Sequence, residues 1–206
     1  YLMQTRLIRL FILIIVFITV LSFSPCLKNG FTEWDDQAYV IHNEMIRSLS
    51  LENIKNIFSI SGVRGDIPFV KSLYHPLPFL TYAVEYHFFQ LNPSVYHCTN
   101  IILHVLNTLL VFWMIFILAD NVIVAFITAI FFGVHPLRVE SVAWIAERKD
   151  VLYSFFFLAS LICYIYYMKK RAYNYYYLSL FMFLLSLFSK PMAVTLPFVL
   201  LLFDYF

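Results

Sequence analysis

The sequence predicts an all-α protein, a polytopic bundle of transmembrane helices with a large first loop on the non-cytoplasmic side. Of the 206 residues, 62% are hydrophobic and 13% are charged, whereas soluble domains have about 45–50% apolar and about 25% charged residues. The mean hydropathy is +0.80, and long apolar runs recur along the chain. The net charge of +2 gives no reason to expect a nucleic-acid partner. The three cysteines do not suggest a disulfide framework.

The first predicted transmembrane helix (TM1) covers residues 7–23. This run has Arg6 and Arg9 at its start and is 17 residues long, which is the lower limit for an apolar helix that crosses a bilayer. A cleaved signal peptide would have a similar apolar core, but no small-residue cleavage site follows before Pro25. An uncleaved helix is therefore the favoured interpretation.

A polar outer loop is expected over residues 24–74. It contains eleven charges, five positive and six negative. Apolar residues recur at helical spacing from Leu51 to Phe58, directly after Ser50. The loop should therefore contain a short amphipathic helix that is capped by this serine and lies on the membrane surface.

Three carboxylates gather early in this loop. Glu33, Asp35 and Asp36 fall within four residues, beside Trp34. Carboxylates this close together can serve as general acid and base or hold a metal ion. A solvated turn is the simpler explanation for an isolated pair of aspartates, so the residues alone leave both interpretations open.

The next two apolar runs differ in length. Residues 76–89 are too few to cross the membrane and include charged and polar side chains, so a juxtamembrane helix is expected. Residues 96–118 are predicted as the second transmembrane helix (TM2). Its polar residues form one stripe, which in lipid must face protein or water. The stripe either makes helix-to-helix hydrogen bonds or lines a substrate cavity; its members are His97, Asn100, His104, Asn107 and Thr108.

Four further apolar runs follow. We expect TM3 over 122–134, TM4 over 151–168, TM5 over 175–189 and the start of TM6 over 191–206. Between TM3 and TM4 lies a charged outer segment, residues 135–150. Pro136 can be the first residue of a short helix in this segment, and one face of that helix would carry Glu140, Trp144, Glu147 and Arg148.

The charged segment, residues 135–150, is the most unusual part of the chain. It holds six of the chain's 26 formal charges although apolar runs flank it on both sides. Ionisable groups next to membrane segments are costly to bury and tend to mark functional surfaces. These six residues are Arg138, Glu140, Glu147, Arg148, Lys149 and Asp150.

Counting the helices gives a consistent orientation. If Arg6 and Arg9 are cytoplasmic, the basic cluster at residues 169–171 falls on the same side, as the positive-inside rule requires. The outer loop, the charged segment and Lys190 then share the opposite side. Carboxylates and cations from distant parts of the chain are therefore expected to meet at one face of the membrane.

Several of these stretches resemble one class of membrane enzymes. The chain is similar to membrane glycosyltransferases of the GT-C class. It resembles more closely the transmembrane and tetratricopeptide-repeat-containing (TMTC-like) O-mannosyltransferases and their bacterial relatives. The resemblance is carried by Trp34-Asp35-Asp36, His75-Pro76-Leu77, the string from His135 to Ile145, Glu147-Arg148-Lys149-Asp150 and the string from Ser189 to Pro197.

This resemblance implies an activity and a set of partners. A sugar, mannose in the animal members, would move from a polyprenyl-phosphate donor to a Ser or Thr hydroxyl of a protein acceptor, next to membrane lipid. The 206 residues would be an N-terminal fragment of a GT-C-like domain, and C-terminal tetratricopeptide repeats would follow. The expected location is the bacterial plasma (inner) membrane, or the endoplasmic reticulum membrane in a eukaryote.

This chemistry suggests roles for individual residues. Asp35 or Asp36 would take the proton of the acceptor hydroxyl, with Glu140 as a second carboxylate. The leaving lipid phosphate needs a cation, and the planar arginine group suits phosphate oxygens. The candidate substrate contacts are His75, His135, Arg138, Arg148, Lys149 and Lys190. A divalent metal, Mn²⁺ or Mg²⁺, could instead be held by Asp36, Glu140 and His135.

Purely structural roles remain open for several of these residues. Arg138 and Glu140 could neutralise each other, and the charges at 147–150 could form ion pairs at a helix end. Lys190 could extend to the membrane surface as an anchor, and His135 could cap a helix.

Two other functions also remain open. A lipid or small-molecule transporter could use the polar stripe of TM2, although its charges would be expected nearer the membrane midplane. The chain could instead be a catalytically inert membrane anchor for a tetratricopeptide scaffold, although the acidic loop argues against this.

Overall fold

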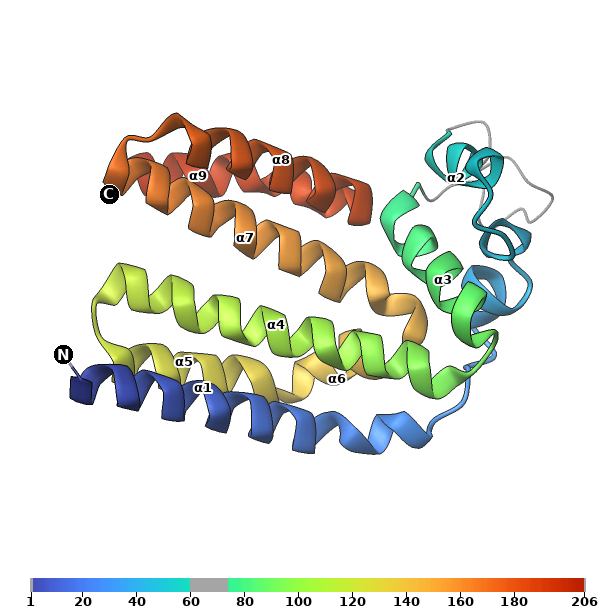
Figure 1. Ribbon diagram of the computed structural model, residues 1–206, viewed down its shortest axis with the longest axis horizontal. Coiled ribbons are helices and arrows are strands. Elements are labelled where there is room, and N and C mark those ends of the chain that lie inside the picture. The colour runs from blue at the N-terminus through green and yellow to red at the C-terminus, as the bar shows by residue number, and fades with distance from the viewer. Residues whose placement is uncertain (1, 60–73, 206) are drawn as a thin grey trace.

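The computed structural model describes residues 2–59 and 74–205, and every regular element among these residues is helical. The predicted all-α class is therefore confirmed. Most of the helices lie side by side in a bundle, and α2 and α3 gather at one end of it (Figure 1). The bundle consists of α1 (Leu2–Phe23), α4 (Pro93–Ala119), α5 (Val122–Val134), α7 (Arg148–Lys170), α8 (Tyr173–Ser189) and α9 (Leu196–Tyr205); the end helices are α2 (Leu51–Phe58) and α3 (Pro76–Phe89).

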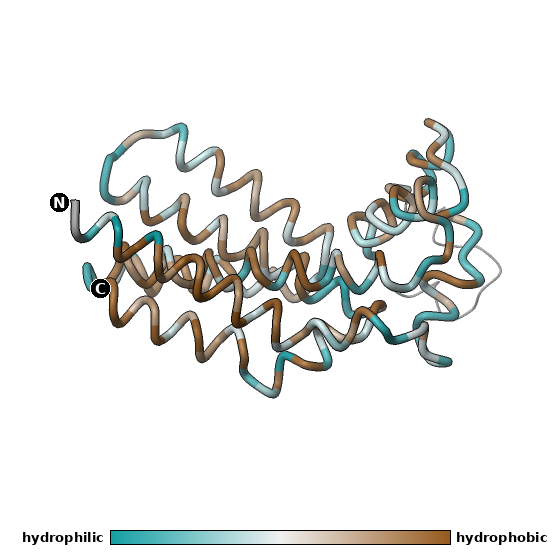
Figure 2. Tube along the Cα trace, turned by 60° about the horizontal axis from the view of Figure 1, so that its bottom comes forward, coloured by the Kyte–Doolittle hydropathy of each residue, from teal (hydrophilic) through white to brown (hydrophobic). Residues whose placement is uncertain are grey.

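Three helical stretches in the described part are long and apolar enough to cross a membrane. They are Gln4–Lys28, Pro93–Ala119 and Ile145–Lys170. A fourth crossing arises only if α5 and the following Pro136–Ala143 stretch count as one span bent by 54°. Along the bundle helices, hydrophobic residues predominate, and hydrophilic ones concentrate at the ends (Figure 2).

Three of the helices that were predicted as crossings are short. α5 has 13 residues, α8 has 17 and α9 has 10. At about 1.5 Å per residue these helices measure about 20, 26 and 15 Å, against a hydrocarbon core of about 30 Å. The sequence boundaries were nevertheless close, because Asn121 caps α5 at the predicted start and the chain turns at Lys190-Pro191 after α8.

The two ends of the bundle carry different features. The start of α1, with Arg6 and Arg9, and the end of α7, with the basic cluster, lie at the same end (Figure 1). The described parts of the outer loop, α3 and the start of α7 lie at the opposite end. This arrangement agrees with the parity expected from the sequence. Residues 60–73 of the predicted outer loop lie outside the described residues.

The described part of the outer loop packs on α3 through its own apolar core. Tyr39, Ile46, Ile57, Tyr82 and Ile145 are at most 1% exposed and form one cluster. Side chains from the loop, α2, α3 and the charged segment therefore interlock, and the acidic stretch is held against residue 145. The Ser50 side chain accepts the amide hydrogen of Asn53, which confirms the predicted cap of α2.

Arg148 joins α3, α4 and α7 at the centre of this region. Its side chain is fully buried, and NH1 lies 3.0 Å from Oε1 of Glu85. The guanidinium also donates to Asn100 Oδ1, Thr81 Oγ1 and the carbonyl of Tyr96. All three side-chain nitrogens donate within the protein, which indicates a structural role for Arg148; its role as a substrate contact stays a prediction.

The polar stripe of α4 is buried, and it makes the predicted helix-to-helix hydrogen bonds. Asn107 donates to the carbonyl of Val151 at 2.8 Å, and Nε2 of His104 lies 2.9 Å from the carbonyl of Gly133. His104 and Asn107 also line a cavity. The hydrogen-bonding alternative is therefore confirmed, and the substrate cavity stays a prediction.

The charged segment is not the single short helix that was expected. It consists of η6 (Pro136–Arg138), α6 (Val139–Ala143) and η7 (Ile145–Glu147), with Trp144 in extended conformation at φ −95° and ψ 123°. Asn100 donates to the carbonyl of Trp144 at 3.0 Å, and this tertiary contact stabilises the break. Glu140 is consequently separated from the helix face that was predicted to hold Glu147 and Arg148.

Replacement of Arg148 by Gln should destabilise the protein by about 3–5 kcal/mol, because it leaves the Glu85 carboxylate buried without its cation. Thermal unfolding of the detergent-solubilised protein measures this. Lys55→Gln, which removes an exposed charge from α2, is the matched control and should leave the unfolding temperature unchanged. An unchanged unfolding temperature in Arg148→Gln would refute the structural role.

Candidate functional site

The acidic stretch docks on the charged segment through Asp36. The Asp36 side chain is fully buried, and its Oδ1 accepts the amide hydrogen of Ala146 at 2.8 Å. Its Oδ2 accepts from the amide and the hydroxyl of Thr32, at 2.8 and 3.0 Å. Both carboxylate oxygens are thus engaged inside the protein. Asp36 positions the loop, and the neighbouring Asp35 is left as the more accessible carboxylate.

Asp35 belongs to an ion-pair network around Lys149. The Lys149 Nζ lies 3.9 Å from Asp35 Oδ2 and 2.8 Å from Glu147 Oε1. It also lies 5.0 Å from the ring centroid of Tyr39. The Asp35 side chain is 27% exposed, against 13% for Glu147, so Asp35 is the carboxylate of this network that an incoming group reaches most easily.

His75 lies close to the same network. It precedes α3, is 4% exposed and packs 6.5 Å from the ring of Tyr39. Burial, together with the positive charges of Lys149 and Lys190, lowers the pKa of His75 to about 4. His75 is therefore neutral near pH 7 and can serve as a hydrogen-bonding group but not as a cation.

A polar cavity of about 230 Å³ lies next to this network, between α4, α5 and α7. It contains two cations, Arg138 and Lys190, and one carboxylate, Asp150, which forms an ion pair with Lys190. Oδ1 of Asn107 is buried with no hydrogen-bond partner among the described residues. The wall comprises His104, Asn107, Phe132, Arg138, Ser141, Asp150, Val151, Tyr153, Ser154, Lys190 and Met192.

A second, mainly apolar groove of about 400 Å³ adjoins the polar cavity. Arg138 and Phe132 line both, and the guanidinium of Arg138 lies 4.5 Å from the ring centroid of Phe132. The groove follows the bend after α5 and is bordered by Phe131 and Leu137, which are 67% and 80% exposed. An apolar groove on the surface of a membrane helix thus leads to a cationic cavity.

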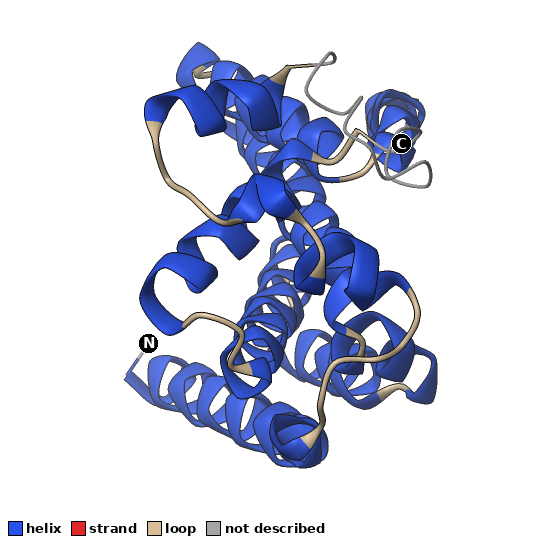
Figure 3. Cartoon of the chain, turned by 90° about the vertical axis from the view of Figure 1, so that its right-hand side faces the viewer, coloured by secondary structure: helices blue, strands red, loops and turns tan. Residues whose placement is uncertain are grey.

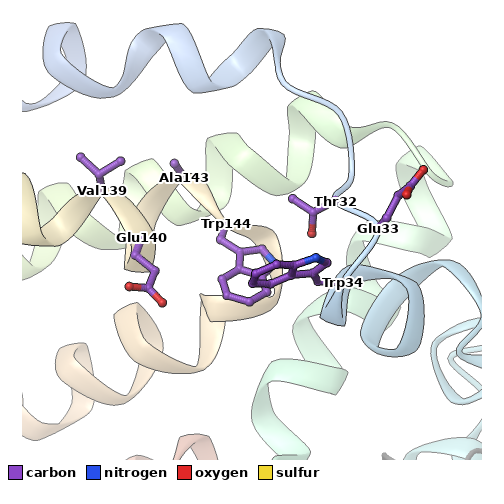
Figure 4. A pocket seen from close by; sticks show the side chains of 7 residues that line it. All are labelled: Thr32, Glu33, Trp34, Val139, Glu140, Ala143 and Trp144. Carbon is purple, nitrogen blue, oxygen red and sulfur yellow. The ribbon is translucent and has the colours of Figure 1, made fainter.

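A third cavity, of about 520 Å³, lies on the other side of α6. Figure 4 shows the indoles of Trp34 and Trp144 at its centre, with Glu140 to one side and Glu33 to the other. The ring centroids are 5.8 Å apart in an edge-to-face arrangement. α6 contributes Glu140 to this cavity and Ser141 to the polar one.

The structure brings some of the predicted site residues together and separates others. Asp35 and Lys149 form one network, with His75 close enough to sense the lysine charge. Arg138 and Lys190 share the polar cavity. Glu140 lies apart from them in the third cavity and forms no ion pair with Arg138 in the described structure.

The predicted metal site does not fit the three residues proposed for it. The oxygens of Asp36 already accept three hydrogen bonds, and His135 uses Nδ1 to accept the amide hydrogen of Leu137 at 3.2 Å. No group of three His, Cys, Asp or Glu side chains within the described residues could hold a metal ion. His135 therefore acts as the helix cap that the sequence left open as an alternative.

Three residues of these networks and cavities were not singled out from the sequence as site residues: Glu147, Asp150 and Asn107. Glu147 and Asp150 were noted only as charges of the segment. The pair of Glu147 with Lys149 is one of the ion pairs that the sequence left open, but the partner of Asp150 could not be foreseen, because it lies 40 positions away. Asn107 was recognised as part of the polar stripe, and this was the one signal in the sequence for a cavity-lining amide.

The described residues form an all-helical protein (Figure 3). It has apolar helices of membrane-spanning length and a cavity lined by Arg138 and Lys190. The sequence is distantly homologous to protein O-mannosyl-transferases. It is 38% identical to human TMTC2 over 101 residues, which are 49% of this chain and 12% of that protein. It is 38% identical to human TMTC1 over 96 residues, or 44% of this chain and 10% of that protein.

A more distant relative matches over a longer region. The Caenorhabditis elegans protein O-mannosyl-transferase F38B6.6 is 28% identical over 169 residues, which are 79% of this chain and 24% of that protein. The chain thus spans between about a tenth and a quarter of the length of these relatives. No protein-family model and no solved structure matches it. The resemblance predicted from the motifs is confirmed as homology.

The low pKa of His75 predicts an effect of pH on stability. Between pH 6.5 and about 4 the unfolded chain binds a proton at this histidine and the folded protein does not. The free energy of unfolding should therefore fall as the pH drops through this window. The fall should be at most about 1.4 kcal/mol per pH unit. Thermal unfolding at several pH values, compared between the natural protein and His75→Gln, isolates this effect. Parallel pH profiles for the two proteins would contradict the assignment.

Proposed function

We propose that this chain carries the donor-binding and acid–base groups of a membrane glycosyltransferase. The enzyme would transfer a sugar, mannose or a close relative, from a polyprenyl-phosphate donor to a Ser or Thr hydroxyl of a protein at the non-cytoplasmic face. One observation carries the proposal: the polar cavity with Arg138 and Lys190 and the apolar groove share Arg138 and Phe132. An amphiphile with an anionic head and a hydrocarbon tail matches this pair of sites.

The donor would bind with its phosphate in the polar cavity and its prenyl chain in the groove. Arg138 offers two parallel donors to phosphate oxygens, and Lys190 offers a mobile positive charge. In the structure Lys190 forms an ion pair with Asp150. A bound phosphate would replace the Asp150 carboxylate as the partner of the lysine. The amide of Asn107 faces the same cavity and would orient the sugar or the phosphate.

The reaction needs one proton acceptor and one stabilised leaving group. Asp35 would take the proton from the acceptor hydroxyl while the oxygen forms a bond to the anomeric carbon of the sugar. The bond between this carbon and the phosphate oxygen breaks, and the electron pair leaves with the lipid phosphate. Arg138 and Lys190 would stabilise the developing charge, and Lys149 would orient Asp35 through the network with Glu147.

Asp35→Asn should lower the rate of sugar transfer by about 100-fold or more, because the amide cannot accept the proton. The measurement is transfer of radiolabelled sugar from a polyprenyl-phosphate donor by the full-length protein in proteoliposomes. Glu52→Gln, an exposed carboxylate on α2, is the matched control and should retain full activity. Undiminished transfer by Asp35→Asn would remove this residue from the reaction.

Arg138→Gln and Lys190→Gln should each weaken binding of the polyprenyl-phosphate donor by about tenfold or more, since each removes a charge-assisted contact to phosphate. Binding of polyprenyl phosphate without a sugar, measured by competition, tests the head-group contact separately from catalysis. Unchanged affinity in both variants would refute the phosphate site. Donor transport across the bilayer without any sugar transfer would instead indicate a transporter.

A further inference from the structure

We propose that the cavity between Trp34 and Trp144 binds a lysine or arginine side chain of the acceptor polypeptide. That this polypeptide is the acceptor rests on the proposed transferase function, whereas the preference for a basic side chain rests on the residues of the cavity. Its wall consists of Thr32, Glu33, Trp34, Val139, Glu140, Ala143 and Trp144.

The two carboxylates of this cavity are its distinctive feature. Glu33 and Glu140 are exposed, and neither forms an ion pair within the described structure. Four other carboxylates of the same region each have a cationic partner: Asp35, Glu85, Glu147 and Asp150. The wall includes no Lys, Arg or His, so a basic ligand would meet no competing cation in it.

The aromatic pair matches the same ligand. The indoles of Trp34 and Trp144 meet at 69°, with centroids 5.8 Å apart, and the Trp34 side chain is 76% exposed (Figure 4). Indole is the side chain that attracts cations most strongly through its ring face. A neutral sugar could stack on the rings, but it would leave both carboxylate charges uncompensated. A lysine or arginine side chain stacked on the rings would have a carboxylate on either side of them, Glu140 on one and Glu33 on the other (Figure 4).

The position of the cavity suits a substrate that extends past the reacting group. Trp34 directly precedes Asp35, the proposed base, and α6 separates the cavity from the polar cavity proposed for the donor phosphate. A polypeptide anchored by its basic residue would therefore place neighbouring residues beside Asp35. The unpaired carboxylates would also draw basic segments to this face, an effect that salt weakens.

Peptide binding can be followed with the protein's own fluorescence. The chain has three tryptophans, and two of them line this cavity. In full-length protein with every tryptophan outside the cavity, including Trp113, replaced by phenylalanine, indole emission reports on Trp34 and Trp144. The probes are a short serine-containing peptide with two lysines, the same peptide with glutamines in their place, and methyl mannoside. A polyoxyethylene detergent avoids the sugar and choline head groups that could compete.

The lysine peptide should change the emission with an affinity at least about tenfold higher than that of the glutamine peptide. The double variant Glu33→Gln/Glu140→Gln should abolish this preference, whereas Glu52→Gln should retain it. Equal affinity for the two peptides, or a preference that persists in the double variant, would overturn the proposal. A response to methyl mannoside in place of the peptides would overturn it as well and identify a sugar subsite.

This binding measurement requires neither a donor nor sugar transfer. Failure of the peptide preference would thus leave the transferase proposal standing. Full activity of Asp35→Asn would refute the assigned base without affecting the peptide result.

Discussion

The candidate site depends on one buried carboxylate. Asp36 joins the loop near the start of the chain to the amide of Ala146, 110 residues later. A buried carboxylate without partners would be costly, and this one is stabilised by three donors from two separate segments. Its position fixes those of its neighbours: Trp34 reaches Trp144, and Asp35 reaches Lys149.

A second buried network supports this contact. Arg148 holds the start of α7 against α3 and α4 through Glu85 and Asn100. Asn100 also stabilises the break in the charged segment by donating to the carbonyls of Val142 and Trp144. Charged and polar residues near a membrane thus have two separate roles in this chain. Some form buried hydrogen bonds and ion pairs that hold segments together, and others line cavities where a ligand can reach them.

The sequence predicted the helices better than it predicted the roles of the charges. The bounds of α3 and α5, the Ser50 cap and the buried stripe of α4 followed from local patterns, because periodicity and capping depend on residues a few positions apart. Whether Arg148 binds substrate or Glu85 depends on a partner 63 residues away, and local pattern contains no such information. The same reason explains why Asp36 and Asp35, adjacent in sequence, could not be told apart before their surroundings were known.

The number of membrane crossings stays a prediction, and helix length bears on it directly. A run of 17 residues is at the lower limit for crossing a bilayer, whereas the 13 residues of α5 reach that length only together with the bent stretch that follows. The bend after α5 illustrates the consequence. Because the helix stops short, the chain turns at His135-Pro136, and the apolar groove and Arg138 come together at the turn.

The most direct test of this account is hydrogen exchange at the Ala146 amide. The account predicts strong protection in the natural protein and a large loss of protection in Asp36→Ala, with amides inside α4 unaffected. Equal protection of Ala146 in both proteins would show that Asp36 does not hold the loop on the charged segment, and the arrangement of the cavities would lose its basis.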